Sequence, residues 1–261
     1  MDLNLAGKHA LVGGGSKGIG YAAAVELALL GASVTLMARN ETDLQKAVES
    51  LDTRQGQQHG FLAVDMGQTD ALQKQLSQLV AEKPIHILVN NTGGPPGGLA
   101  HEAALAEYLQ AFTNHLLANQ LLVQAVWPGM KAAGYGRIIN VISTSVKQPL
   151  PNLGVSNTIR GAVANWAKTL ANELGQYGIT VNNILPGATS TDRLAAIVQN
   201  KSNKTGLSAD ILEAEMKAEI PARRFAEPKE LGAAIAFLAS PAAAYINGIN
   251  LPVDGGRTGS L

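Results

Sequence analysis

The sequence predicts an α/β fold: one domain with a doubly wound parallel sheet of about seven strands and helices on both faces. Short apolar runs alternate with longer helical patterns along the 261 residues, as they do in doubly wound folds. The short runs are apolar throughout rather than at every second residue, which indicates strands that helices bury on both faces. No linker or change of composition divides the chain, so we expect a single domain over residues 1–261.

Each predicted strand is one of these apolar runs. The strands are expected, in chain order, at His9–Gly13, Ser33–Ala38, Gly60–Val64, Ile85–Asn90, Arg137–Ile142, Thr180–Leu185 and Asn250–Val253. Helical patterns follow the first two strands, over Tyr21–Leu30 and Glu41–Leu51, and others separate the later strands. The polar stretch Gln199–Ser208 is expected to be a mobile insertion. We predict that it belongs to a lid or substrate loop around residues 189–222.

Composition excludes several classes of function. Lys and Arg number 20, and so do Asp and Glu, so no net charge recruits nucleic acid or an anionic membrane. The chain has no cysteine, which removes disulfides, thiol nucleophiles and cysteine-ligated metals, and we expect no metal site. The N-terminal residues M-D-L-N-L-A-G-K-H carry no apolar signal, and no run of about 18 apolar residues occurs. We therefore expect a cytoplasmic protein with no membrane partner.

A glycine-rich segment, G-G-G-S-K-G-I-G at residues 13–20, lies between the first strand and the first helix. Glycines allow a tight turn and a close approach to a pyrophosphate, while the helix N-terminus offers free N–H groups. In this setting the segment predicts a dinucleotide site, as in a single-domain Rossmann fold. The residues expected to bind the cofactor here are Gly14, Ser16, Lys17, Gly18, Ile19 and Gly20.

The end of the second strand indicates which dinucleotide binds. An acidic residue there would bond the adenosine ribose and select NAD, whereas this chain has Ala38-Arg39-Asn40. Arg39 can grip the 2′-phosphate of NADP by a two-pronged contact, and Lys17 can add a point charge. We therefore predict NADP, with NAD less favoured. The alternative is that both residues are solvated surface cations.

Further motifs follow in order along the whole chain: N-N-T-G at 90–93, T-N-H at 113–115, I-I-N-V-I-S at 138–143, P-G at 186–187, T-D at 191–192 and V-D-G-G at 253–256. Together with the glycine turn they resemble the short-chain dehydrogenase/reductase family, and its 3-oxoacyl-carrier-protein reductase-like members in particular. The resemblance implies that Asp65 caps the adenine ring. It also implies cofactor contacts from Asn91, Gly93, Pro186, Gly187 and Thr191, and catalytic roles for Asn114 and Ser143.

One motif of the family is altered. The Tyr-x-x-x-Lys that the resemblance implies would begin at Ser156, and its Lys would stand at Arg160, so this chain has Ser-x-x-x-Arg. A phenol beside an ammonium group can donate a proton near neutral pH. A serine hydroxyl is shorter and a far weaker acid, and Arg holds its proton more firmly than Lys. We expect Arg160 to position the cofactor ribose, and Ser156 to relay a proton at most.

Three substitutes for the missing proton donor can be considered, and two of them stay open. A water held by Ser143, Asn114 and Ser156 is the first, and Lys147 in the following loop is the second. The third candidate is His115, which follows Asn114. Neighbouring helix positions point about 100° apart, so His115 is expected to be a packing histidine. Hydride transfer to an activated double bond would bypass the loss of the Tyr altogether.

These observations predict an NADP-dependent oxidoreductase acting on a carbonyl, an alcohol or an activated double bond, with an atypical active site. The alternative is a catalytically silent NADP-binding sensor or structural subunit. Apolar residues in Leu150–Leu153 and Leu194–Val198 favour an apolar small-molecule substrate. The resemblance implies a homotetramer, with a dimer as fallback. The helix over Gly161–Leu174, rich in small apolar residues, would pack in the interface.

Overall fold

The computed structural model describes residues 1–260 and contains one sheet of seven strands, in the order β3-β2-β1-β4-β5-β6-β7. Every pair of neighbouring strands is parallel. The predicted fold is confirmed, and the strand ends differ from the prediction by at most two residues. The strands are β1 His9–Gly13, β2 Ser33–Ala38, β3 Gly60–Ala63, β4 Ile87–Asn90, β5 Gly136–Val141, β6 Ile179–Pro186 and β7 Asn250–Val253.

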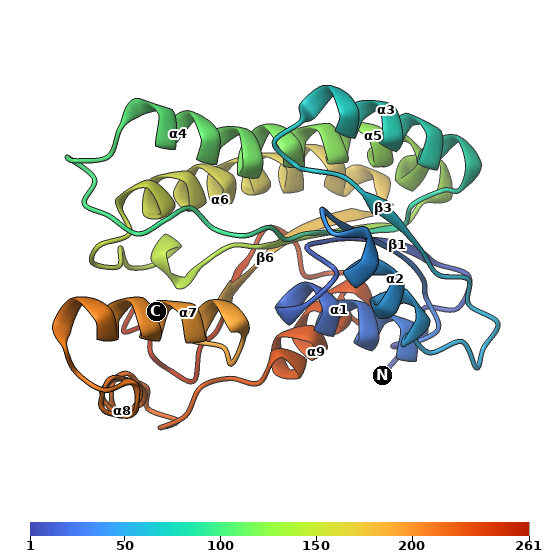
Figure 1. Cartoon of the computed structure of the whole chain (residues 1–261). Helices are drawn as coiled ribbons and strands as arrows, with labels where there is room; N and C mark the ends of the chain where they lie inside the picture. The colour runs from blue at the N-terminus through green and yellow to red at the C-terminus, as the bar shows by residue number, and fades with distance from the viewer. Residues whose placement is uncertain (261) are drawn as a thin grey trace.

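Helices cover both faces of the sheet (Figure 1). On one face lie α3, α4, α5 and α6, and on the other lie α1, α2 and α9. The helices are α1 Gly18–Leu29, α2 Glu41–Glu49, α3 Thr69–Glu82, α4 Leu105–Phe112, α5 Ala118–Ala133, α6 Gly154–Leu174, α7 Asp192–Thr205, α8 Ala209–Ala218 and α9 Pro228–Ala239. A π-helical turn, Thr113–Leu117, joins α4 to α5.

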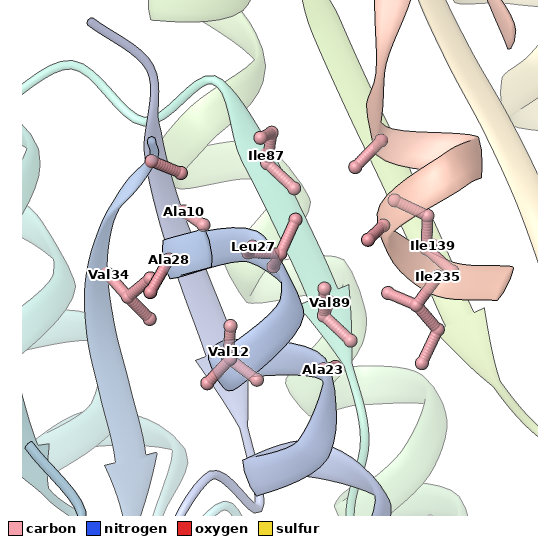
Figure 2. Packing of buried hydrophobic residues seen from close by; sticks show 14 of the residues in the cluster. Ala10, Val12, Ala23, Leu27, Ala28, Val34, Ile87, Val89, Ile139 and Ile235 are labelled. Carbon is pink, nitrogen blue, oxygen red and sulfur yellow. The ribbon is translucent and has the colours of Figure 1, made fainter. Parts of the chain in front are cut away.

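Small residues let α1 lie close to the sheet and to α9. Figure 2 shows Leu27 and Ala23 of α1 over the strand residues Val12 and Val89, all of them buried. Where α1 meets α9, a Cβ built on Gly232 would lie 2.7 Å from the carbonyl oxygen of Ala22. This contact is closer than any side chain allows, so the glycine sets the distance between the two helices.

The central strands are less apolar than the sequence pattern predicts. Asn90, Asn140, Asn183 and Asn250 are register neighbours on β4, β5, β6 and β7. Their side-chain amides form a ladder, with N···O distances of 2.8, 2.9 and 2.8 Å. Buried amides are tolerated because each one donates to or accepts from the next. The ladder joins four neighbouring strands at one level of the sheet, from the last residue of β4 to the first residue of β7.

The polar segment that we expected to be a mobile insertion is helical rather than irregular, and its mobility stays a prediction. Gln199–Ser208 forms the last turns of α7, the αL residue Gly206 that ends the helix, and the N-cap of α8. Thr191 caps the start of α7, where its Oγ1 accepts a 3.4 Å hydrogen bond from the amide of Leu194. Capping and i,i+4 hydrogen bonds satisfy the backbone, so polar side chains do not prevent a helix. The role of the 189–222 segment as a lid stays a prediction.

Helix α6 is amphipathic, with one apolar face of small residues and one polar face. Val163, Ala167 and Ala171 are buried, whereas Asn165 and Lys168 are exposed. Contacts within the chain therefore account for the apolar face of this helix, and the predicted homotetramer stays a prediction. Among the helices of residues 1–260, none is both long and apolar enough to cross a membrane.

Candidate functional site

The predicted site residues gather at the carboxyl ends of the strands, around the point where the strand order reverses. The chain runs from β1 outward to β2 and β3, and then returns to place β4 on the other side of β1. In open α/β sheets a ligand binds in the crevice that this reversal creates. The glycine turn follows β1, and Asn91 follows β4, so the two segments flank the crevice.

The glycine turn has the shape that a pyrophosphate site requires. Gly14 and Gly18 have φ angles of +56° and +60°, a region that favours glycine. A Cβ on Gly20 would overlap the carbonyl oxygen of Gly14 and lie 2.7 Å from Nδ2 of Asn91. The first turn of α1 thus lies directly against the loop, and its free N–H groups open toward the crevice. Ile19 packs against the core, while Ser16 is half-buried beside it.

At the adenosine end the two predicted cations have different surroundings. Arg39 is exposed just after β2, and Asn40 caps α2 by accepting a 3.0 Å hydrogen bond from the amide of Asp43. Lys17 lies 3.6 Å from a carboxylate oxygen of Asp192, and both side chains are exposed. Such a surface pair contributes little to stability. Arg39 is thus free of a salt bridge within residues 1–260, whereas Lys17 reaches across the crevice toward α7.

Backbone turns line the rest of the predicted cofactor site. The Asp65 carboxylate accepts a 2.8 Å hydrogen bond from the amide of Gly67, which orients it after β3. A Cβ on Gly187 would lie 2.7 Å from Cα of Asp254, so β6 can end beside β7 only with glycine here. Thr191 lies against the glycine turn, since a Cβ on Gly18 would be 3.5 Å from its Cγ2. Two predicted residues remain. Pro186 is half-buried at the end of β6, and Gly93 is exposed in the loop after β4.

The four predicted catalytic residues come from three elements. Ser143 follows β5, and its Oγ accepts a 3.1 Å hydrogen bond from the amide of Ser145. Asn114 lies in the π-helical turn, where its Oδ1 accepts a 2.9 Å hydrogen bond from Gln110. Ser156 is buried in the first turn of α6. One turn later, Arg160 donates a 2.9 Å hydrogen bond to the carbonyl oxygen of Val141, so its guanidinium reaches the end of β5 that carries Ser143.

Arg160 is a buried cation without a carboxylate. The residue is 8% exposed, and among the described residues its Nε has no hydrogen-bond partner. Burial, reinforced by the positive charge of Arg193, lowers the pKa of Arg160 to about 10. The guanidinium still carries its charge at neutral pH, and that charge is poorly compensated by the protein.

Two residues near this charge were not among the predicted site residues. His115 is buried, as expected of a packing histidine, but burial and then the charges of Arg160 and Arg193 lower its pKa to about 3. It is therefore neutral at physiological pH. Arg193, in the first turn of α7, donates a 3.1 Å hydrogen bond to the carbonyl oxygen of Gly94. No local pattern marks Arg193, because its partner is 99 residues away in the chain.

Comparison with known proteins identifies the family. Residues 14–258 match the family model described as enoyl-(acyl carrier protein) reductase. The chain is 34% identical over 257 residues to the 3-oxoacyl-(acyl-carrier-protein) reductase FabG of Vibrio cholerae serotype O1, covering 97% of this chain and 98% of that protein. The chain belongs to the short-chain dehydrogenase/reductase family.

Two solved structures share the whole fold. One is L-sorbose reductase from Gluconobacter frateurii, complexed with NADPH and L-sorbose, with a TM-score of 0.94 and 32% identity over 100% of both chains. The other is YwfH, an NADPH-dependent reductase involved in bacilysin biosynthesis, with a TM-score of 0.92 and 28% identity over 97% of this chain and 99% of that chain.

Proposed function

We propose that this chain is an NADP-dependent reductase acting on a carbonyl group or an activated double bond of a small molecule. The observation that carries the proposal is the glycine turn, in which Gly20 leaves no room for a side chain against Gly14 and Asn91. Arg39, exposed at the end of β2, supports NADP over NAD because its guanidinium can grip the 2′-phosphate. The likeness to two NADPH-dependent or NADPH-bound reductases supports the same cofactor.

Bound NADPH would supply the hydride. In this proposal Ser143 and Asn114 orient the substrate or a water molecule, and Arg160 places a fixed positive charge beside the cofactor ribose. Reduction of a carbonyl to an alcohol adds one hydride to carbon and one proton to oxygen. Ser156 has no phenol to donate that proton, so a water molecule ordered by the serines and the amide is the donor. An activated double bond would accept its hydride at carbon with a smaller demand for an acid.

A silent NADP-binding protein is the second candidate, because Ser156 and Arg160 stand where the family resemblance implies Tyr and Lys. The two candidates are separated by following NADPH oxidation with ketones, 3-oxoacyl thioesters, quinones and enones. The wild type is compared with the double variant Ser156→Tyr/Arg160→Lys, and with Ser143→Ala as a control for the active site. Direct titration of NADPH fluorescence shows whether each variant still binds the cofactor.

We expect the wild type to turn over at least one compound, and Ser143→Ala to slow that turnover about tenfold or more. Activity in the double variant alone, with normal NADPH binding in both proteins, would mean that only proton donation was lost and would favour the silent binder. Turnover by the wild type would make Lys147→Ala the next variant, since Lys147 is the nearest alternative donor in sequence.

We also propose a homotetrameric, cytoplasmic protein. Apolar side chains on α4 support an assembly, since Leu105 is 81% exposed and Leu109 is 69% exposed. Light scattering at working concentration tests the assembly, and a monomer would overturn it.

A further inference from the structure

Resting on the proposed reductase function, we propose that the substrate is an organic acid. Its carboxylate is bound by Arg193, beside the buried charge of Arg160, while its carbonyl group or double bond faces Ser143. This replaces the apolar substrate expected from the sequence with an anionic one. The proposal depends on three features: the placement of Arg193, the uncompensated charge of Arg160 and the position of both relative to the cofactor's phosphates.

The backbone of the loop after β4 fits the side chain of Arg193. A Cβ on Gly94 would lie 2.6 Å from Nη2 and 3.1 Å from Cζ of Arg193, so the guanidinium occupies the side of the glycine where a side chain would stand. Nη1 donates to the carbonyl oxygen of Gly94 at 3.1 Å. That contact uses one N–H direction, and the planar guanidinium has further donors suited to a carboxylate.

The charges around this loop are not balanced. Of the ion pairs in residues 1–260, none includes Arg160 or Arg193. The nearest acidic residue along the chain, Asp192, is paired with Lys17 at 3.6 Å. Arg160 is buried, and a buried cation is costly unless an anion or several acceptors surround it. Arg193 is exposed, so an anionic ligand that it binds would lie beside the buried charge of Arg160 and offset part of that cost.

The depressed pKa values agree with this arrangement. Partial burial lowers the pKa of Arg193, and burial followed by the charge of Arg193 lowers that of Arg160. Among residues 1–260, no acidic group is a cause of either pKa shift. His115, which senses both charges, is neutral and does not add to them. Both arginines therefore supply positive charge on this side of the crevice.

The position of Arg160 and Arg193 favours binding of the substrate's carboxylate over binding of the cofactor's 2′-phosphate. Arg39 lies after β2, at the adenosine end of the crevice, whereas Gly94 follows β4 and Val141 ends β5. The two arginines thus lie on the side of the sheet reversal that carries Ser143. The cofactor's pyrophosphate is a second anion that competes with the substrate for the two arginines. The experiment below separates binding of the substrate's carboxylate from binding of the pyrophosphate.

The test uses 2-oxopentanoate, 4-oxopentanoate and 5-oxohexanoate, each beside its methyl ester, so that the carboxylate charge is the variable. Calorimetric titration of the NADP⁺-loaded protein measures binding without requiring turnover, and NADPH oxidation measures KM and kcat separately. The variants are Arg193→Gln and Arg193→Lys. Arg54→Gln is the matched control, because Arg54 is an exposed arginine whose ion pair with Asp52 lies away from the crevice.

We expect at least one acid to bind about tenfold or more tightly than its ester, as a charged, two-pronged contact allows. Arg193→Gln should abolish that preference while leaving the Kd for NADPH within about twofold, and Arg193→Lys should retain part of it. Arg54→Gln should change neither quantity. Selective binding of an acid, with no turnover of that acid or of any compound in the panel above, would support the anion site while refuting the reductase function.

Three results would overturn the proposal. The first is equal binding of acids and esters, and the second is no binding of any acid. The third is a loss of NADPH affinity in Arg193→Gln with an unchanged preference for the acid, which would assign Arg193 to the pyrophosphate. Turnover of neutral ketones combined with any of these results would leave the reductase function standing.

Discussion

The side-chain amide of Asn91 donates a 3.1 Å hydrogen bond to the carbonyl oxygen of Gly13. This bond crosses the reversal of strand order, since Gly13 ends β1 and Asn91 follows β4. It fixes the glycine turn relative to the loop after β4, in which Gly94 accepts the hydrogen bond of Arg193. A disturbance of the turn is therefore expected to affect both halves of the crevice.

Gly20→Ala should weaken cofactor binding. The new methyl group would overlap the carbonyl oxygen of Gly14 and approach Nδ2 of Asn91 at 2.7 Å, which forces the turn and α1 apart. We expect a loss of about tenfold or more in NADPH affinity and about 1–3 kcal/mol in the free energy of unfolding. Gly129→Ala in α5 is the control, because a Cβ there meets nothing within 4 Å. Normal NADPH binding by Gly20→Ala would contradict the packing described for this turn.

Arg39→Ala should lower the preference for NADPH over NADH. Loss of the guanidinium removes the contact to the 2′-phosphate, a group that NADH lacks, so the affinity for NADPH should fall about tenfold or more while that for NADH is retained. Fluorescence titration with both cofactors measures the ratio. Lys17→Ala should have a smaller effect, since Lys17 is paired with Asp192. An unchanged ratio in Arg39→Ala would refute the assignment of NADP through this residue.

Asn140→Val should destabilise the protein far more than the small change in side-chain volume predicts. Asn140 is fully buried, and its removal leaves Nδ2 of Asn90 and Oδ1 of Asn183 without their partner. We expect a loss of about 2–4 kcal/mol in urea unfolding, against about 1 kcal/mol for the control Ile138→Val on the same strand. Equal losses in the two variants would show that the amide ladder contributes nothing to stability.

Stability should fall as the pH drops below about 6.5. Burial lowers the pKa of His115 to about 3 and that of His9 to about 4, so both are neutral in the folded protein when the unfolded chain already binds protons. For each histidine, the loss of unfolding free energy begins as the pH falls below its pKa in the unfolded chain. The loss grows until the pH reaches its pKa in the folded protein. At pH 5 each histidine should cost about 2 kcal/mol relative to pH 7.

His115→Gln separates this effect from general acid destabilisation. The quantity compared is the difference in the free energy of unfolding between pH 7 and pH 5, rather than the stability at one pH. That difference should shrink by about 2 kcal/mol in the variant, since glutamine does not titrate. A difference equal to that of the wild type would mean that His115 is not buried in its neutral form.

Much of the fold and of the cofactor site was predictable because the signals are local. A buried parallel strand is a short apolar run, and the glycine turn is one contiguous segment between a strand and a helix, so both can be predicted from neighbouring residues. The local pattern was misleading where polarity suggested a loop, at Gln199–Ser208. There the cap at Thr191 and the hydrogen bonds of α7 stabilise a helix regardless of polar side chains.

The sequence by itself determined the parallel α/β sheet, the dinucleotide turn and the replacement of the expected Tyr and Lys by Ser156 and Arg160. Only the tertiary structure decided which charges meet and which are left unbalanced. Arg193 contacts Gly94 across 99 residues, and the asparagine ladder joins residues separated by 50, 43 and 67 positions. Such contacts arise when distant strands and helices pack together, and no periodicity within a segment encodes them.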